Sequence, residues 1–347
     1  WYTLAEYCCR WQVRFDEVYD LIKNDVNLSE FRHVVFLVYG LTTGGMGEVG
    51  VSPHEVDGQT FDLSLAWVAV NDTYASPSSW GTQPFTWTNM DFLLSHELGH
   101  NLGVYHANHL ECGARRSINH PDCYGLEYGN YFDVMGTSHK SLHFNGFFKR
   151  VFGWLTGRPA VLNINRSGTY ELRPLEQNQG ARVARVRTST GNHPFYLEYR
   201  RAIGFDRKLS NQQFRNNQRG LFVNWIKRDN DLASYLLDLT PTSSNFDDWD
   251  NVVLPVSVRN QRRVFRDRRR GITIGPVLEA NNQRIRFNVD IVDIPCERHE
   301  PTIDEYWSAE AQAGIPFWGS VTTTNNDSLV CSTSIFHIDI TPPEGWT

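Results

Sequence analysis

The sequence of 347 residues contains no long hydrophobic run and no excess of positive charge. Its longest apolar stretches, such as Val34–Val38, have the length of a β-strand, whereas a helix needs about 20 apolar residues to span a bilayer. The formal net charge is −6, and a general nucleic-acid binder would be basic. We therefore expect neither a membrane-spanning helix nor a nucleic acid among the partners.

Two signals of ligand binding are also missing. The glycine-rich segment Gly40–Gly50 is not followed by Gly-Lys-Ser or Gly-Lys-Thr, so a nucleotide-binding phosphate loop is disfavoured and a loop between strands is expected. Asp247, Asp248 and Asp250 do not have the D-x-D-x-D-G spacing of a calcium loop. Calcium binding by these aspartates stays an open alternative.

Cysteine is scarce, but its placement is informative. Six cysteines and four N-x-[ST] sequons favour an oxidising, secretory environment, so we expect an extracellular (secreted) protein. Two pairs are candidates for disulfides: Cys112 with Cys123, which bracket a loop rich in polar and turn residues, and Cys296 with Cys331. The adjacent Cys8 and Cys9 rarely bond to each other. Because the chain also lacks an initiator methionine and a signal peptide, we expect it to be a fragment whose N-terminal piece is missing.

An H-E-x-x-H-x-x-G-x-x-H motif begins at His96. Residues four apart lie on the same side of a helix, so His96 and His100 can both reach one metal ion. A positive φ at Gly103 would turn the chain and return His106 as a third ligand. Three neutral imidazoles leave one tetrahedral position open, where zinc would hold a water of pKa ~7, and Glu97 is placed to take its proton.

The residues before this motif predict the helix that carries it. Thr88–Asp91 has the spacing of a capping box, so we expect the helix to begin near Asn89. Leu94, Leu98 and Leu102 form a stripe at four-residue spacing. We expect this stripe to face the core, with the histidines on another face that opens on a cleft.

The motif resembles the signature of the metzincin clan of zinc endopeptidases, and Tyr131–Gly136 resembles the methionine turn that follows it in that clan. The resemblance implies that Met135 forms an apolar floor beneath the metal, although a methionine in a loop is by itself usually a packing residue. His139 and His143, which follow the turn, are candidates for substrate contact or simply structural histidines.

Within the clan, several segments are most similar to the gametolysin (autolysin) family: Asp133–Gly136, His143–Asn145, Phe152–Leu155, Arg200–Asp206 and Tyr235–Pro241. Ala107 departs from the Ser, Asp, Glu or Pro that often follows the third histidine in the clan. The assignment to this family is therefore weaker than the assignment to the clan.

The segment Phe61–Val70 predicts a strand, because apolar residues alternate along it. In the clan, a strand shortly before the zinc helix forms the upper rim of the cleft and pairs with the substrate backbone. Leu65, Ala66 and Trp67 are the candidates for that substrate-binding strand. The alternative is an ordinary interior strand, because alternation cannot distinguish an edge from a centre.

The chain is long enough for two or three domains. We expect an α+β fold with a metzincin-type catalytic domain at residues 1–158, formed by a twisted sheet and the active-site helix, from which the N-terminal strand is missing. The composition shifts at Gly157–Pro159 to short strand-like runs separated by turns, which predicts an all-β sandwich domain at 159–294. Residues 295–347 are expected to form part of an immunoglobulin-like module.

These observations predict a secreted, Zn²⁺-dependent endopeptidase in which Glu97 activates the attacking water. The resemblance to gametolysin implies protein or glycoprotein substrates of the extracellular matrix or cell wall, while the oligomeric state stays open. One alternative is a catalytically silent adhesion or glycan-binding protein on a metzincin scaffold. Another is a polyanion-binding matrix protein that uses the seven arginines of Arg259–Arg270, which otherwise form a solvated hairpin.

Overall fold

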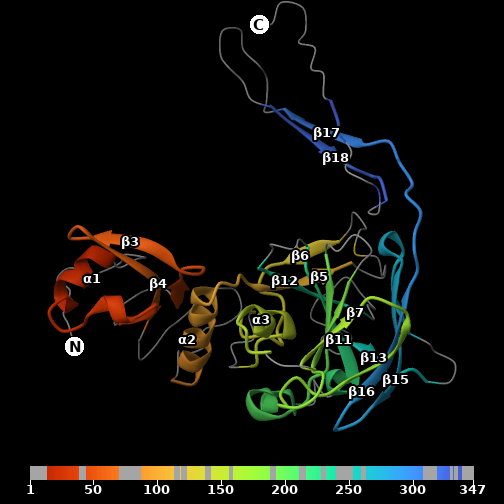
Figure 1. Cartoon of the computed structure of the whole chain (residues 1–347), viewed down its shortest axis with the longest axis horizontal. Coiled ribbons are helices and arrows are strands. Elements are labelled where there is room, and N and C mark those ends of the chain that lie inside the picture. The colour runs from red at the N-terminus through yellow and green to blue at the C-terminus, as the bar shows by residue number, and fades with distance from the viewer. Residues whose placement is uncertain are drawn as a thin grey trace, which may run out of the picture.

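The computed structural model describes residues 14–38, 44–69, 87–112, 118, 123–136, 142–155, 159–187, 193–210, 216–227, 232–239, 253–258, 263–307, 319–328, 331 and 335–337. This part of the chain is built mostly from strands with few helices, which confirms the α+β class (Figure 1). No helix in it is long and apolar enough to cross a membrane. Several predictions fall outside the described residues: those on Cys8, Cys9, His139, Asp247, Asp248, Asp250, Arg259 and Arg262.

The N-terminal part is one helix on a four-stranded sheet. Its elements are α1 (Phe15–Ile22), η1 (Leu28–Glu30), β1 (His33–Val38), β2 (Gly45–Gly47), β3 (Ser52–Val56) and β4 (Gln59–Ala69). The long strand β4 pairs in parallel with β1 and antiparallel with β2 and β3. The buried face of α1, which includes Val18 and Ile22, shares a hydrophobic core with Leu63 and Leu65 of β4. Burial of this apolar face stabilises the helix against its sheet.

The pairing of β4 corrects the expectation that Leu65, Ala66 and Trp67 lie at an edge. Ala66 is opposite Val35 of β1 on one side and opposite Gly47 of β2 on the other. The backbone of β4 is therefore already hydrogen-bonded within the sheet and is not free to pair with a substrate. The edge on this side is β2, whose sheet partner among the described strands is β4.

Two further sheets form the β-rich part of the molecule. The larger has the order β6-β5-β12-β11-β10-β9-β7, with β13 also paired to β11, and the smaller has the order β14-β15-β16-β8. The bounds of the larger sheet are β5 (Ala107–Glu111), β6 (Tyr124–Leu126), β7 (Val161–Ile164), β9 (Val183–Val186), β10 (Phe195–Glu198), β11 (Gly220–Trp225), β12 (Ser234–Leu237) and β13 (Leu254–Pro255). Those of the smaller are β8 (Gly168–Leu172), β14 (Phe265–Asp267), β15 (Ile272–Ala280) and β16 (Ile285–Ile291). Fully buried side chains such as Phe195 and Phe287 place both sheets around one core.

The larger sheet crosses the predicted domain boundary near residue 158. β5 pairs in parallel with β12, with Ala107 opposite Ser234, so strands from both sides of that boundary lie in one sheet. β5 and β6 are also joined by the Cys112–Cys123 disulfide, which confirms that predicted pair. The segment directly after the histidine motif is thus built into the β-rich part. The division into domains itself stays a prediction.

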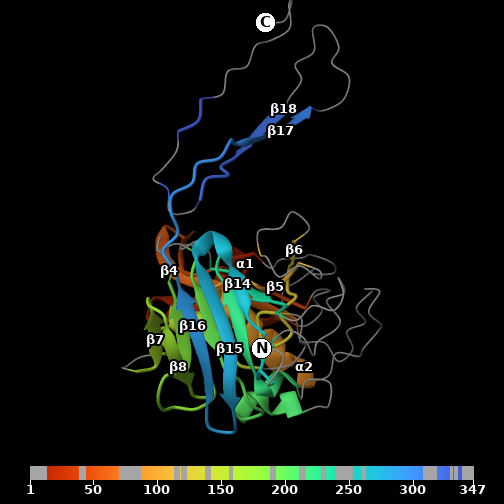
Figure 2. The same cartoon turned by 90° about the vertical axis from the view of Figure 1, so that its right-hand side faces the viewer.

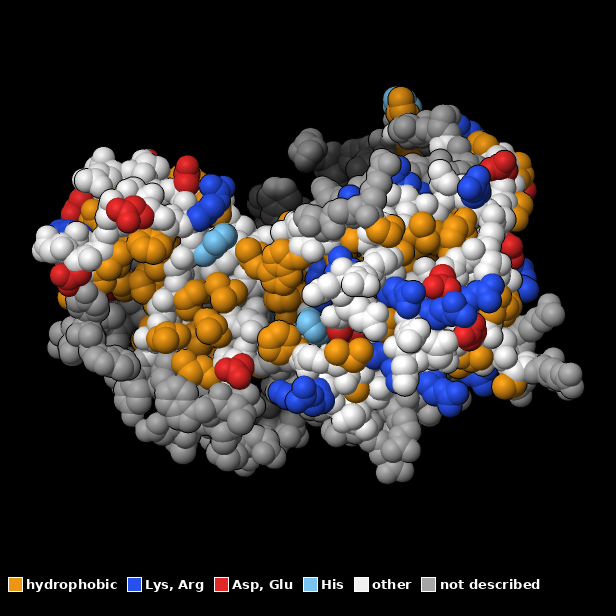
Figure 3. All heavy atoms as spheres, turned by 60° about the horizontal axis from the view of Figure 1, so that its bottom comes forward, with side chains coloured by type: hydrophobic (Ala, Val, Ile, Leu, Met, Phe, Trp, Pro, Cys, Tyr) orange, Lys and Arg blue, Asp and Glu red, His pale blue; other side chains and the backbone are white. Residues whose placement is uncertain are grey.

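The helix of the histidine motif, α2 (Trp87–Asn101), lies between the β1–β4 sheet and the β-rich part, next to α3 (Gly146–Val151) (Figure 1). The short helices η2 (Gly204–Ser210), η4 (Asn216–Arg219) and η5 (Arg268–Arg270) lie in the connections of the β-rich part. Figure 3 shows hydrophobic side chains gathered over the lobe formed by α1 and β1–β4, and Lys and Arg side chains over the β-rich lobe.

Beyond residue 295, β17 (Thr302–Trp307) and β18 (Gly319–Thr324) form an antiparallel hairpin. The hairpin stands apart from the rest of the protein (Figures 1 and 2). The second predicted disulfide, Cys296–Cys331, lies at its base. The immunoglobulin-like interpretation of this segment stays a prediction.

Candidate metal centre

α2 begins and ends close to the predicted positions. Gly103 has a φ of 95°, and its N–H donates to His100 O at 2.8 Å. This is the left-handed conformation that glycine adopts at low cost after a helix. It directs the chain away from the helix axis, through His106 and into β5, as the sequence predicts.

The buried face of α2 is not the one that the leucine stripe predicts. Leu94, Leu98 and Leu102 are only partly buried, whereas His96 and His100 are buried. The histidine face is enclosed because β2, β4 and the turn around Met135 pack against it. Packing by segments distant in sequence thus overrides the amphipathic pattern of the helix itself.

The structure brings the three predicted ligands together. One ring nitrogen from each of His96, His100 and His106 lies within 4.8 Å of the other two, and the Nε2 atoms of His100 and His106 are 3.1 Å apart. Four-coordinate zinc with nitrogen ligands at ~2.0–2.1 Å would separate two such nitrogens by about 3.4 Å. The spacing therefore suits one metal ion, although the residues do not decide which metal.

A hydrogen bond at Nδ1 fixes the tautomer and the orientation of each histidine ring. Nδ1 lies 2.8 Å from Val134 O in His96, 2.8 Å from Val104 O in His100 and 2.7 Å from Glu127 Oε1 in His106. A carbonyl or carboxylate only accepts, so Nδ1 carries the hydrogen and donates it, and Nε2 keeps a lone pair. Nε2 lone pairs that converge at this distance repel one another unless a cation binds between them. The donor set therefore fits a metal.

The same surroundings keep the imidazoles neutral. Burial lowers the pKa of His96 to about 3 and that of His100 to about 4, and it also lowers the pKa of His106. Neutral imidazole is the form that ligates a metal. The three imidazoles can consequently bind a cation at neutral pH without releasing protons of their own.

Glu97 is buried beside the ligands and lies against β2. A Cβ atom added to Gly45 would be 2.8 Å from Glu97 Oε1, and one added to Gly47 would be 3.2 Å from Oε2. Burial raises the pKa of Glu97 to about 8, opposed by a backbone hydrogen bond from Gly47. A cation held by the adjacent histidines would lower this pKa again, because a nearby positive charge favours the carboxylate.

Sequence reasoning missed three parts of this site. Gly45–Gly47 was expected to be loop, yet it forms the edge strand over Glu97. The available signal is a pair of glycines two residues apart, which leaves one face of a strand without side chains. Glu127 and Tyr128 were also missed, because nothing local indicates that a turn 21 residues after His106 folds back onto it.

Met135 is fully buried, and its Sδ atom lies against Gly99 of α2. Gly99 lies between His96 and His100 in the helix. Its backbone N–H donates to Asp133 Oδ1 at 2.8 Å, and its carbonyl accepts from Ala107 N at 2.9 Å. These bonds hold the turn against the segment that follows the third ligand. The role of Met135 as a floor beneath a metal stays a prediction.

A buried ionic network supports the methionine turn from the β-rich part. Arg200 donates to both carboxylate oxygens of Asp206, at 2.7 and 2.8 Å, and to the carbonyls of Phe132 and His143. Because Arg200 and Asp206 are fully buried, each needs the other as a partner. The segment that follows β10 and the helix η2 are thus coupled to the turn beside the three histidines.

His143, a candidate for substrate contact, is largely enclosed by this network. Its Nδ1 atom is 3.2 Å from Lys149 Nζ, and its ring lies edge-on to Phe205 with centroids 5.3 Å apart. Burial lowers the pKa of His143 to about 4. These contacts favour the alternative of a structural histidine.

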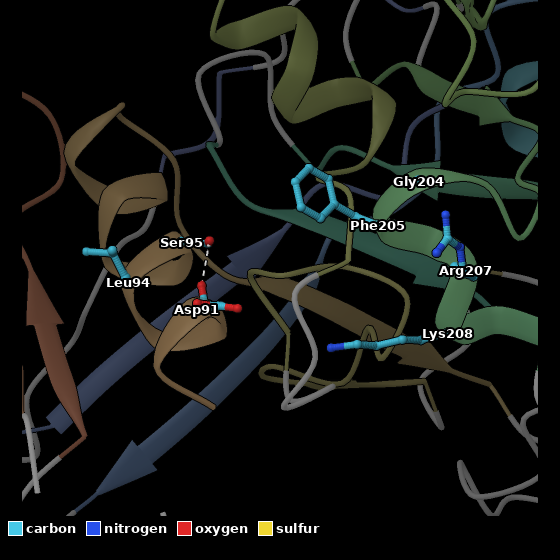
Figure 4. Close-up of a pocket in the computed structure, with 7 residues that line it drawn as sticks. All are labelled: Asp91, Leu94, Ser95, Gly204, Phe205, Arg207 and Lys208. Carbon is cyan, nitrogen blue, oxygen red and sulfur yellow. Dashed lines mark hydrogen bonds between the residues drawn. The ribbon is translucent and has the colours of Figure 1, made fainter. Parts of the chain in front are cut away.

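A cleft of about 580 Å³ lies between α2 and η2 (Figure 4). It is lined by Asp91, Leu94 and Ser95 of α2 and by Gly204, Phe205, Arg207 and Lys208 of η2. With 3.6 residues per turn, Asp91 lies about 180° around the helix from His100. This cleft is therefore separate from the histidine site.

The arginine run does not form one uniform surface. Arg266, Arg268 and Arg269 are exposed, whereas Arg270 is buried and ion-paired with Asp267 at 2.5 Å. Arg270 therefore has a structural role, and polyanion binding by the exposed arginines stays a hypothesis.

Comparison with protein families, curated proteins and solved structures found no match. The case for a metal site at the three histidines therefore depends on their geometry alone. They form a group that could hold a metal ion, in an α+β protein whose described residues include two disulfides.

Proposed function

We propose that the protein is a secreted zinc endopeptidase of the metzincin type, most similar to the gametolysin family. The observation that carries the proposal is the placement of Glu97 beside three imidazoles whose Nε2 atoms converge. A buried carboxylate next to an open metal position is the arrangement that peptide hydrolysis by an activated water needs. The two disulfides support an oxidising, extracellular setting.

The residues would divide the chemistry as follows. Zinc at the three imidazoles would supply a Lewis acid and lower the pKa of water at the open position. Glu97 would accept the proton of the attacking water and pass it to the leaving amine. Its burial beneath β2 keeps the carboxylate out of bulk water, which strengthens its interaction with the reacting groups.

β2 replaces β4 as the candidate for the substrate-binding edge. It runs directly over Glu97 and pairs with β4 on one side only, within the described sheet. An extended peptide could add to the other side through backbone hydrogen bonds, except at the Gly47 N–H, which already donates to Glu97. Such pairing is insensitive to side-chain identity and suits a protein substrate. Glycoproteins of the matrix or cell wall are what the gametolysin resemblance implies.

Two substitutions separate metal binding from catalysis. Glu97→Ala should retain about one zinc per chain and lose 10²- to 10⁴-fold or more in cleavage rate, because Glu97 acts as a base and not as a ligand. His100→Ala should lose both. Zinc is measured by elemental analysis, cleavage with a denatured protein and a hydroxyproline-rich glycoprotein, and folding by circular dichroism. Unchanged cleavage by Glu97→Ala would refute the mechanism. A wild-type protein that binds zinc but cleaves neither substrate would favour the adhesion alternative.

A further inference from the structure

His106 is held differently from the other two ligands. His96 and His100 belong to α2 and donate to backbone carbonyls, whereas His106 follows the end of the helix in a segment without regular structure. Its Nδ1 partner is the side chain of Glu127, at 2.7 Å, and that side chain is 70% exposed. A flexible, solvated carboxylate by itself restricts the orientation of an imidazole only weakly.

The next residue supplies a second contact to the same ring. The ring centroid of Tyr128 lies 3.6 Å from that of His106, with 32° between the planes. The Tyr128 ring also stacks towards His96, with centroids 5.8 Å apart and planes at 20°. Consecutive residues therefore contact His106 at its edge and on its face. Together they fix both the tautomer and the plane of the ring.

The position of Tyr128 is fixed by its backbone conformation and by hydrogen bonds to β5. Its φ of 61° is uncommon for a residue with a bulky side chain and persists only where the surroundings impose it. Its N–H donates to Asn108 Oδ1 at 3.1 Å, and Asn130 N donates to Ala107 O at 3.1 Å. Both acceptors belong to β5, which begins directly after His106. The turn that follows β6 is thus tied to the strand that follows the ligand.

We propose that Glu127 and Tyr128 form a clamp on His106 that sets the metal affinity of the site. Both are positioning residues, because they act on the metal through the imidazole. The clamp rests on the metal site of the proposed function but not on peptidase activity. Without it, His106 would rotate about its side-chain bonds in the metal-free protein, and binding would have to restrict that freedom.

Three variants divide the clamp into its parts. Tyr128→Asn removes the ring and preserves the backbone, since asparagine tolerates the left-handed conformation. Tyr128→Phe keeps the ring and removes only the hydroxyl group. Glu127→Gln keeps an acceptor and removes the charge. Tyr105→Asn is the matched control, because Tyr105 is half exposed and adjacent to His106 in the chain.

The readout is the dissociation constant for zinc, measured by competition with a chromogenic chelator, together with the visible absorption of the cobalt-substituted protein. We expect Tyr128→Asn to weaken zinc binding about 10- to 100-fold and Glu127→Gln about 10-fold, as changes to groups that orient ligands do. Tyr128→Phe and Tyr105→Asn should bind as wild type. Thermal unfolding of the metal-free proteins checks that each variant folds.

Wild-type zinc affinity in both Tyr128→Asn and Glu127→Gln would overturn the clamp. Equal losses in Tyr128→Phe and Tyr128→Asn would also overturn it, because the ring would then not be the contact that matters. If the wild-type protein binds neither zinc nor cobalt, there is no metal affinity for the clamp to set, and the proposal is refuted. If the protein binds zinc and the variants weaken binding, the clamp stands even when no peptide is cleaved.

Discussion

Replacing Gly45 by alanine tests how closely the edge strand β2 approaches the proposed general base. The added Cβ would lie 2.8 Å from Oε1 and 2.9 Å from Cγ of Glu97, and 3.0 Å from Trp67 O. Carbon atoms in van der Waals contact are normally about 3.5–4.0 Å apart, so something must move by about 0.5–1 Å. Because the Trp67 carbonyl belongs to the sheet, the Glu97 side chain is the group that yields. Gly45 does not have a positive φ, so alanine itself fits the backbone.

Gly45→Ala is expected to lower the rate of cleavage without changing zinc binding. A displacement of about 1 Å at a reacting group lowers the rate about 100-fold. Overpacking should lower the free energy of unfolding by about 1–3 kcal/mol. The three atoms nearest to the added methyl group belong to Glu97 and Trp67, so the histidine ligands keep their positions. Zinc content should therefore stay near that of the wild type.

Two neighbouring glycines give matched comparisons. A Cβ on Gly44 would meet only Leu93, at 3.5 and 3.7 Å, which is ordinary contact. Gly44→Ala should therefore behave as wild type. A Cβ on Gly47 would lie 2.6 Å from the backbone oxygen of Glu97 and 3.0 Å from His100 Cβ. Gly47→Ala should displace the α2 backbone and reduce both zinc binding and cleavage.

The assay is kcat/KM on a protein substrate for the wild type and the three alanine variants, with zinc content and thermal unfolding measured on the same preparations. The reasoning predicts a graded result in which Gly44→Ala is silent, Gly45→Ala loses activity alone, and Gly47→Ala loses metal as well. Full activity in Gly45→Ala would refute the contact between β2 and Glu97.

Two further predictions concern the turn and the disulfide next to the site. Met135→Leu should keep its zinc and change the free energy of unfolding by less than about 1.5 kcal/mol, as volume-conserving core substitutions do, and loss of zinc would assign the sulfur a direct role. Replacing both Cys112 and Cys123 by serine should lower the free energy of unfolding by about 3 kcal/mol, from the loop entropy of a short closed segment, measured by urea denaturation. Peptide mapping of the native protein without reductant should recover these cysteines as one linked pair, and two alkylatable thiols would contradict the structure.

The sequence was informative where the partners lie close together in the chain. His96 and His100 are one helical turn apart, and the ligand set could be predicted because helical periodicity and the conformational freedom of Gly103 are local properties. The Cys112–Cys123 pair was likewise indicated by two cysteines that bracket a short loop. The α+β class followed from the same local patterns of helix and strand.

The sequence was misleading where neighbours in space come from distant segments. The leucine stripe of α2 predicted the wrong buried face, because β2 and the methionine turn cover the side that carries His96 and His100. The strand containing Ala66 looked the same as an edge strand, since alternation records two different faces and says nothing about how many strands lie alongside. Its position between β1 and β2 depends on segments that are not contiguous with it.

The sequence by itself therefore determined which residues can hold a metal, His96, His100 and His106, and that the carboxyl group of Glu97 is next to them in the chain. Only the tertiary structure decided how those residues are held, with β2 over Glu97 and the Glu127–Tyr128 clamp on His106. The physical reason is that ligand identity and helical spacing are properties of one short segment. Burial, ring orientation and the protonated nitrogen of each imidazole are instead set by contacts with distant residues, as in the bond between His96 and Val134, which is 38 positions away.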